Sequence, residues 1–352
     1  MENGHSDIKT LLGLHPVHKY LTGRLLAFGE DRDIPRMFSS MGRFSMDDAL
    51  SILQRELGYR LDDGIRARMI KVLIDFFCEC DISVKDGNHY LCNDGCTIPG
   101  RPPADVTVSE KFFRGQVDFF ERCLLHADTF LSGGQPLLSF DNDAAQIWED
   151  FLGNAEFGFA RSVLANVMLS GLDGDAHVLD LCCGPGFDIL NIQECSSTVR
   201  ISALDFKDVF RSRASGRVLN PDAVDWICCE KWGGFGAALP FPPGTFDAVF
   251  FACADPYIAE SRRRFVYSDL FRVIKPGGSL NILSHSYPDA GMKFVEDRWV
   301  RRGTLCHDFA ESVCEGWQGF YSADESINLF ESIGFRIGTI MMNSSIWRLD
   351  KP

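Results

Sequence analysis

One short stretch, residues 177–187, constrains the fold of this chain more than any other. It reads His-Val-Leu-Asp-Leu-Cys-Cys-Gly-Pro-Gly-Phe, a run of apolar, β-prone residues that ends in two closely spaced glycines. This pattern predicts a buried parallel strand, a tight turn and then a helix from Phe187 to Glu194. Gly184 and Gly186 let the backbone approach a ligand without an obstructing Cβ atom. The N-terminus of the predicted helix offers free amide groups to an anion.

Two common nucleotide-binding motifs do not fit this turn. The dinucleotide fingerprint requires G-x-G-x-x-G, and Ile189 occupies the position of its third glycine. The phosphate loop requires G-x-x-x-x-G-K-[ST], a string that does not occur in the sequence. What remains is D-x-x-x-G-x-G, which begins at Asp180. Considered alone, the turn is also compatible with an ordinary strand-to-helix connection.

The turn resembles the first motif of the class I S-adenosylmethionine-dependent methyltransferases, commonly hh(D/E)hGxGxG. Three residues depart from that motif, namely Cys182, Cys183 and Pro185. Cys183 stands where many members have glycine or serine, and it is small enough not to exclude the cofactor.

The segments that follow come in the order of that family. Val199 to Leu204 predicts a second strand that ends at Asp205, about 20 residues past the turn, where dinucleotide folds also place their ribose acid. A carboxylate accepts hydrogen bonds only, which suits the two hydroxyls of a ribose. Val224 to Cys229 predicts a third strand, closed by Glu230 and Lys231, where the family often has a polar residue near the adenine.

The C-terminal part completes the resemblance, which covers about residues 145–352. Leu239 to Phe251 resembles the family's approach to strand four, and Leu270 to Leu283 resembles its passage into strand five. Ser322 to Glu325 forms a capping box that predicts a helix to Gly334. Two closing strands are predicted over Phe335–Met341 and Ser344–Leu349.

The resemblance implies an α/β fold, a doubly wound, seven-stranded and mostly parallel sheet with a reversed final strand. It implies S-adenosylmethionine as the cofactor and a small-molecule substrate. The residues expected to contact the cofactor are Asp180, Cys182, Gly184, Gly186, Asp205, Phe206, Glu230 and Lys231.

The first part of the chain predicts a helical, winged-helix-like domain. Short helices are expected over residues 7–12 and 19–28, and two longer ones begin at Ser45 and near Asp63. The turn residues 86–88 then predict a hairpin. Such a module binds DNA or, in the small-molecule O-methyltransferases that this half resembles, forms a dimer. The net charge of −14 favours a homodimer over a nucleic-acid partner.

These patterns predict three parts: a dimerisation domain over residues 1–106, covering helices over 107–170, and the cofactor-binding domain over 171–352. Residues 95–106, rich in proline and glycine, are expected to link the first two. The polar residues 1–10 and the thirteen cysteines of the sequence predict a cytoplasmic protein with free thiols. No apolar run is long enough for a membrane span. A zinc site of Cys78, Cys80, Cys92 and Cys96 is the disfavoured alternative, because the first two point in different directions on a helix. No metal is therefore expected.

The catalytic residues are expected beyond the carboxyl ends of strands four and five, where open parallel sheets bind ligands. The candidates are Asp255 and Tyr257 after strand four and His285 after strand five. The O-methyltransferases usually have a histidine after strand four, which this chain lacks. His285 is a general base or only a residue of the pocket rim, and Asp255 is a base, an orienting group or a helix cap. The aromatic-rich insertion from Ser286 to Tyr321 predicts a substrate lid.

The predicted function is transfer of a methyl group to a hydroxyl of an aromatic or polyketide-like metabolite. Carbon or nitrogen methylation, other chemistry with the same cofactor, and a non-enzymatic winged-helix regulator remain as alternatives.

Overall fold

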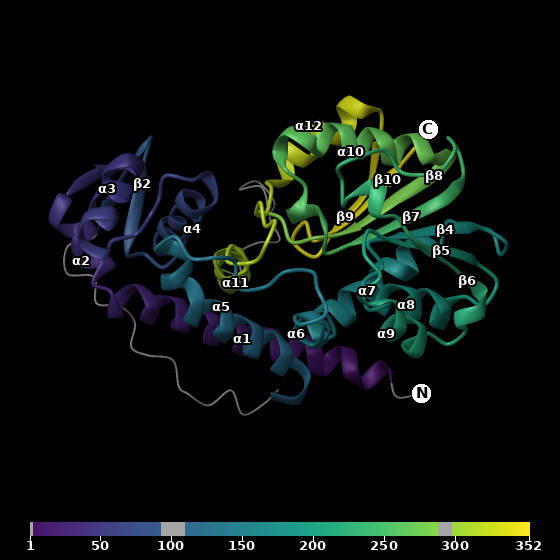
Figure 1. Cartoon of the computed structure of the whole chain (residues 1–352), viewed down its shortest axis with the longest axis horizontal. Helices are drawn as coiled ribbons and strands as arrows, with labels where there is room; N and C mark the ends of the chain where they lie inside the picture. Colours follow the sequence, from purple (N-terminus) through teal and green to yellow (C-terminus); the bar gives the residue numbers. More distant parts are fainter. Residues whose placement is uncertain (1–2, 93–109, 288–297) are drawn as a thin grey trace. The chain divides into compact units, whose positions relative to one another are not determined.

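A computed structural model describes residues 3–92, 110–287 and 298–352, which form two compact units (Figure 1). The first unit comprises Met1–Ser139 and Val295–Gly319, and the second comprises Phe140–Phe294 and Phe320–Pro352. These limits differ from the predicted boundaries at residues 106 and 170. Helix α5 (Glu110–Leu131) joins the first unit because it packs on that unit's helices α1 and α11. The predicted linker over residues 95–106 lies outside the described residues.

The second unit is built on a seven-stranded sheet with the order β6-β5-β4-β7-β8-β10-β9. Every strand runs in the same direction except β10, which is antiparallel to both of its neighbours. The predicted fold class, including the reversed final strand, is therefore confirmed. The strands in chain order are β4 (His177–Leu181), β5 (Arg200–Asp205), β6 (Val224–Cys228), β7 (Phe246–Ala252), β8 (Ile274–Leu283), β9 (Arg336–Met341) and β10 (Ile346–Asp350).

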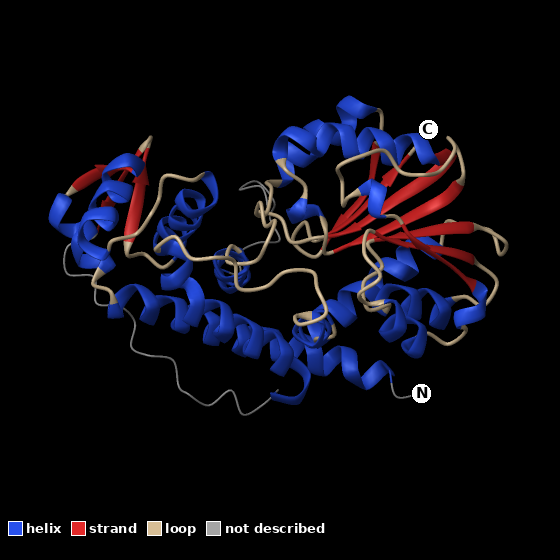
Figure 2. Cartoon of the chain, viewed as in Figure 1, coloured by secondary structure: helices blue, strands red, loops and turns tan. Residues whose placement is uncertain are grey.

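Helices cover both faces of this sheet (Figures 1 and 2). One face carries α10 (Glu260–Val273) and α12 (Ala323–Ile333), and the other carries α7 (Ala155–Leu169), α8 (Phe187–Cys195) and α9 (Arg211–Arg217). Because both faces are buried, the central strands are apolar at nearly every position instead of alternating. A short helix, α6 (Ala145–Leu152), precedes α7.

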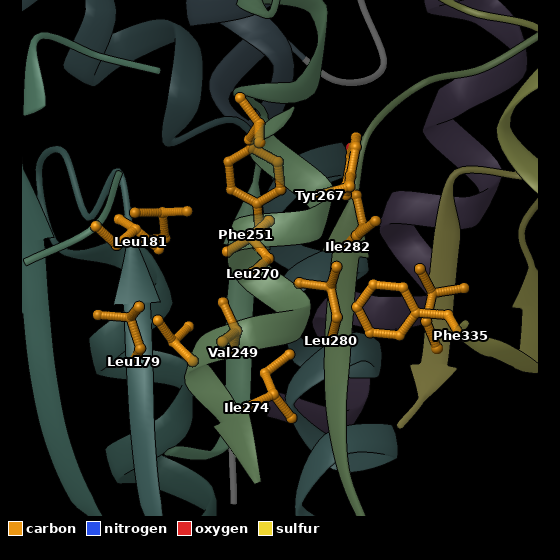
Figure 3. Close-up of a cluster of buried hydrophobic side chains, with 14 of the residues drawn as sticks. Leu179, Leu181, Val249, Phe251, Tyr267, Leu270, Ile274, Leu280, Ile282 and Phe335 are labelled. Atoms are coloured by element: carbon orange, nitrogen blue, oxygen red, sulfur yellow. The ribbon is translucent and has the colours of Figure 1, made fainter. Parts of the chain in front are cut away.

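The two faces have separate apolar cores. Alternate residues of β4 and β7 point to the same side, so Leu179 and Val249 pack with Leu270 of α10 (Figure 3). Their neighbours Val178 and Ala248 pack on the opposite face with α7 and α8. The β4 residue Asp180 shares this second face, since it lies two positions after Val178.

The predicted capping box sets the start of α12. Ser322 Oγ accepts a hydrogen bond from the Glu325 amide, and the Glu325 carboxylate accepts one from the Ser322 amide, both at 3.2 Å. The helix ends at Gly334, whose φ of 116° favours glycine. This part of the prediction is confirmed.

The first unit is mostly helical and contains one three-stranded sheet with the order β1-β3-β2. The predicted order of two helices followed by a hairpin is confirmed. Its elements are α1 (Asn3–Asp31), α2 (Ile34–Met41), β1 (Arg43–Ser45), α3 (Met46–Leu57), α4 (Gly64–Glu79), β2 (Ser83–Asp86), β3 (His89–Cys92), α5, and α11 (Arg298–Glu311). None of the helices described in either unit is long and apolar enough to cross a membrane.

Helix α1 corrects one prediction, since the two short helices expected over residues 7–28 form one continuous helix. Pro16 lies inside it. The buried residues Val17, Leu21 and Leu25 follow at helical spacing, and α1 packs on α5 and α11. Tertiary packing thus outweighs the proline, which usually weakens a helix interior.

The insertion after β8 corrects another prediction. Its described part contains α11, which packs on α1, α4 and α5 within the first unit. Nine consecutive residues from Gly303 to Glu311 are buried there. This part of the expected lid is therefore a core helix of the first unit.

Candidate active site

The turn between β4 and α8 has a backbone that few residues adopt. The φ angles of Cys182, Gly184 and Gly186 are 62°, 46° and 82°. The amides of Cys182 and Cys183 both donate to the carbonyl oxygen of Leu204, at 2.8 and 3.2 Å, which ties the turn to the end of β5. We call residues 182–186 the glycine corner.

The two glycines of this corner have different surroundings. A Cβ atom on Gly184 would meet only the carbonyl oxygen of Cys182, at 3.8 Å, so the backbone remains accessible. A Cβ atom on Gly186 would lie 2.9 Å from Cα and Cβ of Ala214 in α9. Gly186 therefore allows close packing of α9, whereas Gly184 leaves space for a ligand.

Gly186→Ala is expected to lower the free energy of unfolding by about 1–3 kcal/mol more than Gly244→Ala does, because the new methyl group would overpack against α9. Gly244 is the matched control, since its φ of 64° is also left-handed and no atom lies within 4 Å of its would-be Cβ. Urea unfolding of both variants measures the difference. Equal losses would show that the contact with Ala214 is unimportant.

Asp205, at the end of β5, faces the glycine corner. Its two carboxylate oxygens accept hydrogen bonds from the amides of Gly184, at 3.0 Å, and Phe206, at 2.7 Å. Burial raises the pKa of Asp205, and these amide hydrogen bonds oppose that rise. Since each oxygen has a second lone pair, the carboxylate is still able to accept bonds from a ligand.

A pocket lies next to Asp205, at the carboxyl ends of β4, β5 and β6. This is the edge at which parallel sheets bind their ligands. Its walls include both polar and aromatic groups, namely Cys183, Gly184, Asp205, Lys207, Asp208, Phe210, Arg211, Trp226 and Cys228.

Asp180 is fully buried below the corner. Among the described residues, neither of its carboxyl oxygens has a hydrogen-bond partner. Burial, and next the neighbouring charge of Asp188, raise the pKa of Asp180 well above its usual range. A buried acid without a donor is a fitting partner for a cationic ligand group.

The other predicted cofactor residues lie at the same edge of the sheet. Cys182 and Phe206 are half-buried at the ends of β4 and β5. Glu230 and Lys231 are exposed in a short 3-10 helix, Glu230–Trp232, which follows β6. The structure thus brings all eight predicted residues to three neighbouring strand ends, and their individual contacts with a cofactor stay predictions.

A series of aromatic rings connects Phe206, which follows β5, with His285, which follows β8. The ring of Phe140 lies 6.2 Å from Phe206, 5.1 Å from Tyr257 and 5.0 Å from Trp148. Sequence reasoning did not single out Phe140, because a lone phenylalanine between helices carries no pattern. Five more rings follow Phe140, with centroids 5.0 to 6.3 Å apart from one ring to the next: Trp148, Phe151, Phe157, His285 and Phe320. We call these seven rings, from Phe206 through Phe140 to Phe320, together with Tyr257, the aromatic row.

His285 and Asp255, two of the predicted catalytic residues, have different environments. The half-buried His285 ring lies between Phe157 and Phe320, at 5.9 and 5.4 Å. The buried Asp255 carboxylate accepts hydrogen bonds from Arg263, at 3.0 and 3.3 Å, and from the Tyr267 hydroxyl. Asp255 is therefore already engaged by α10, while His285 belongs to the aromatic row.

The described cysteines of the first unit are free thiols. Burial raises the pKa of Cys78 to about 11 and that of Cys80 to about 12. Within residues 3–92, 110–287 and 298–352, no group of three or more suitable side chains is arranged to hold a metal ion. Cys96 lies outside these ranges.

Comparison with known proteins agrees with this geometry. A family model described as "Methyltransferase domain" matches residues 178–278. The demethylmenaquinone methyltransferase of Lactiplantibacillus plantarum is 31% identical over 175 residues, which cover 47% of this chain and 72% of that protein. The 2-phytyl-1,4-beta-naphthoquinone methyltransferase of Arabidopsis thaliana is 28% identical over 135 residues, 38% of this chain and 51% of that relative.

Two solved structures are similar over nearly the whole chain. The CurJ carbon methyltransferase has a TM-score of 0.62 at 14% identity, covering 93% of this chain and 91% of that one. An O-methyltransferase family 2 protein from Planctomyces limnophilus, in complex with apigenin, has a TM-score of 0.60 at 15% identity, covering 99% and 95%. At these identities the similarity shows a shared fold.

Proposed function

Because this chain belongs to the class I S-adenosylmethionine-dependent methyltransferases, we propose that it methylates a hydroxyl of an aromatic or polyketide-like small molecule. Its cofactor is S-adenosylmethionine. The observation that supports an aromatic acceptor is the aromatic row, which begins at Phe206 beside the cofactor corner and reaches His285. Flat rings favour offset or edge-to-face contacts with such side chains.

The residues of the corner suit the parts of this cofactor. Asp205 is placed to accept hydrogen bonds from the ribose hydroxyls, and Gly184 leaves the backbone open beside it. The unpartnered Asp180 suits the cationic amino-acid end. When bound, S-adenosylmethionine supplies a methyl group that its positively charged sulfur already activates. The protein's main contribution is then to align the acceptor.

His285 is our candidate for the general base. A neutral imidazole accepts a proton near neutral pH, and a hydroxyl acceptor has to lose one. Asp255 is a weaker candidate because Arg263 and Tyr267 already donate to its carboxylate. Tyr257, whose ring contacts Phe140, remains a candidate for binding the acceptor.

Methylation of a quinone-like acceptor, at carbon instead of oxygen, is the second candidate. It is favoured by the sequence relatives, which are named for quinone acceptors.

The partner that we propose is a second copy of the chain, bound through the winged-helix-like unit. We further propose a cytoplasmic location, on the free thiols of the described cysteines.

Incubation with methyl-labelled S-adenosylmethionine and a panel of hydroxylated flavones, anthraquinones and reduced naphthoquinones tests the acceptor. Label on an oxygen, located by mass fragmentation of the product, would support the first proposal. Label on a ring carbon would favour the second candidate. Transfer to neither class by protein that binds the cofactor would contradict both.

Asp205→Ala is expected to weaken binding of S-adenosylhomocysteine by about 1–3 kcal/mol, because it removes a charged hydrogen-bond acceptor from the ribose. Asp208→Ala is the matched control, since Asp208 lines the same pocket but is exposed. Titration calorimetry of both variants measures the effect. An unchanged affinity in Asp205→Ala would remove the ribose assignment.

A further inference from the structure

Three buried charged residues from different elements lie on one face of the sheet, below the glycine corner. They are Arg161 of α7, Asp180 of β4 and Asp188 in the first turn of α8, with exposures of 3%, 0% and 5%. Two carboxyls thus share the surroundings of one guanidinium.

Arg161 is occupied by contacts other than Asp180. Its Nε donates to Asp188 Oδ1 at 2.5 Å, its Nη1 donates to the Leu152 carbonyl oxygen at 2.6 Å, and its Nη2 lies 3.8 Å from Cys253 Sγ. Asp180 accepts no hydrogen bond from any described residue. The guanidinium therefore compensates Asp188 and leaves Asp180 as the second, uncompensated acid.

The remaining titratable groups that influence Asp180 do not supply a positive charge. They are Asp205 on β5 and the thiols of Cys182 and Cys183 in the corner. Burial raises the pKa of Asp180. The neighbouring acids Asp188 and Asp205 raise it further, and Arg161 opposes that rise. Asp180 thus holds a proton in the free protein over a pH range in which an exposed aspartate is ionised.

With the cationic amino group of the cofactor placed beside Asp180, as in the proposed function, we propose that cofactor binding releases a proton from Asp180 to solvent. The O–H bond of the carboxyl breaks, its electron pair stays on the oxygen, and the ammonium then donates to the resulting carboxylate. Burial also raises the pKa of Asp188, but the charge and hydrogen bond of Arg161 oppose that rise. Asp188 therefore stays with Arg161, and Asp180 is the acid that changes its charge. This inference rests on the proposed function, since it concerns the same cofactor site.

The sign of the pH dependence follows directly. The free protein holds one proton more than the complex, so a higher pH favours binding. The association constant should rise by up to about tenfold per pH unit below the pKa of Asp180 and level off above it.

Titration calorimetry with S-adenosylhomocysteine at pH 6 tests the proposal. That pH lies well below the usual pKa of an α-amino group, about 7.7–8.0, so the ligand itself exchanges no proton. Measurements in phosphate and in imidazole buffer, which differ in ionisation enthalpy, should give different heats of binding, and the difference reports the proton released per ligand bound.

Two comparisons locate the proton. Asp180→Asn should abolish the dependence of the binding heat on the buffer. Asp205→Asn should weaken binding but leave that dependence unchanged. Methylthioadenosine, which lacks the amino-acid end, should bind to the wild-type protein without releasing a proton. This ligand comparison answers the question even if Asp180→Asn does not fold.

Any other result would overturn the proposal, and the results differ in what else they overturn. Wild-type binding without proton release, or release that persists in Asp180→Asn or with methylthioadenosine, would contradict the role of Asp180 and leave the proposed function standing. No binding of S-adenosylhomocysteine to the wild-type protein would overturn the proposed function together with this inference.

Discussion

His285→Ala is expected to lower kcat by about 10²- to 10⁴-fold, the usual contribution of a general base, while the affinity for S-adenosylhomocysteine stays unchanged. The imidazole follows β8 at the ligand-binding edge of the sheet, and its ring contacts Phe157 and Phe320. Loss of the ring removes the proposed proton acceptor but none of the residues at the ends of β4 and β5. The measurement is kcat against pH in the wild-type protein and the variant, together with calorimetry of the bound product.

Tyr257→Phe is the matched control for this prediction. Tyr257 lies at the same edge and belongs to the same aromatic row, since its ring contacts Phe140, but loss of its hydroxyl should lower kcat far less than loss of the His285 ring. Full activity in His285→Ala would eliminate it as the base. A large loss in Tyr257→Phe alone would transfer the role to the tyrosine hydroxyl.

Asp308→Ala is expected to destabilise the first unit by about 3–5 kcal/mol, because it breaks a buried ion pair and leaves the partner uncompensated. The side chain of Asp308 is fully buried and accepts two hydrogen bonds from Arg68 of α4, at 2.7 and 2.5 Å. The indole of Trp317 donates a third, at 3.0 Å. Denaturant unfolding, with hydrogen exchange of the α4 and α11 amides, measures the loss where it arises.

Asp75→Ala provides the control on the same helix α4. Asp75 accepts from Lys71 at 2.6 Å, but this pair is largely exposed, and such i,i+4 pairs contribute about 0.3–0.5 kcal/mol. A loss in Asp308→Ala no larger than that in Asp75→Ala would show that α11 does not depend on the buried pair.

The strands and the corner of the second unit were predictable because their signals are local. A run of apolar residues before two glycines determines where β4 ends, and the capping box at Ser322 determines where α12 begins. The order of these segments along the chain then indicated the sheet. Even the unusual φ of Cys182 occurs at a residue that departs from the family's first motif.

The candidate site was only partly predictable. The sequence suggested Asp180, Asp205 and His285, but Arg161 carried no signal beyond being one of two charged residues in a largely apolar helix. The sequence position of Asp255 is that of a plausible base, but Arg263 and Tyr267 both donate to its carboxylate. A sequence pattern does not show which charges compensate each other, because that depends on distances between elements.

The sequence by itself indicated where the strands, the two glycines of the corner and the capped helix lie, because these signals depend on residues close together in the chain. The sheet and the class of cofactor followed from the resemblance of these segments, taken together, to a known family. Only the tertiary structure decided that α11 is a core helix of the first unit. Its buried Asp308 binds Arg68, which lies 240 positions earlier in the sequence. A buried charge is stable only beside its partner, and folding alone brings partners so distant in sequence within hydrogen-bonding distance.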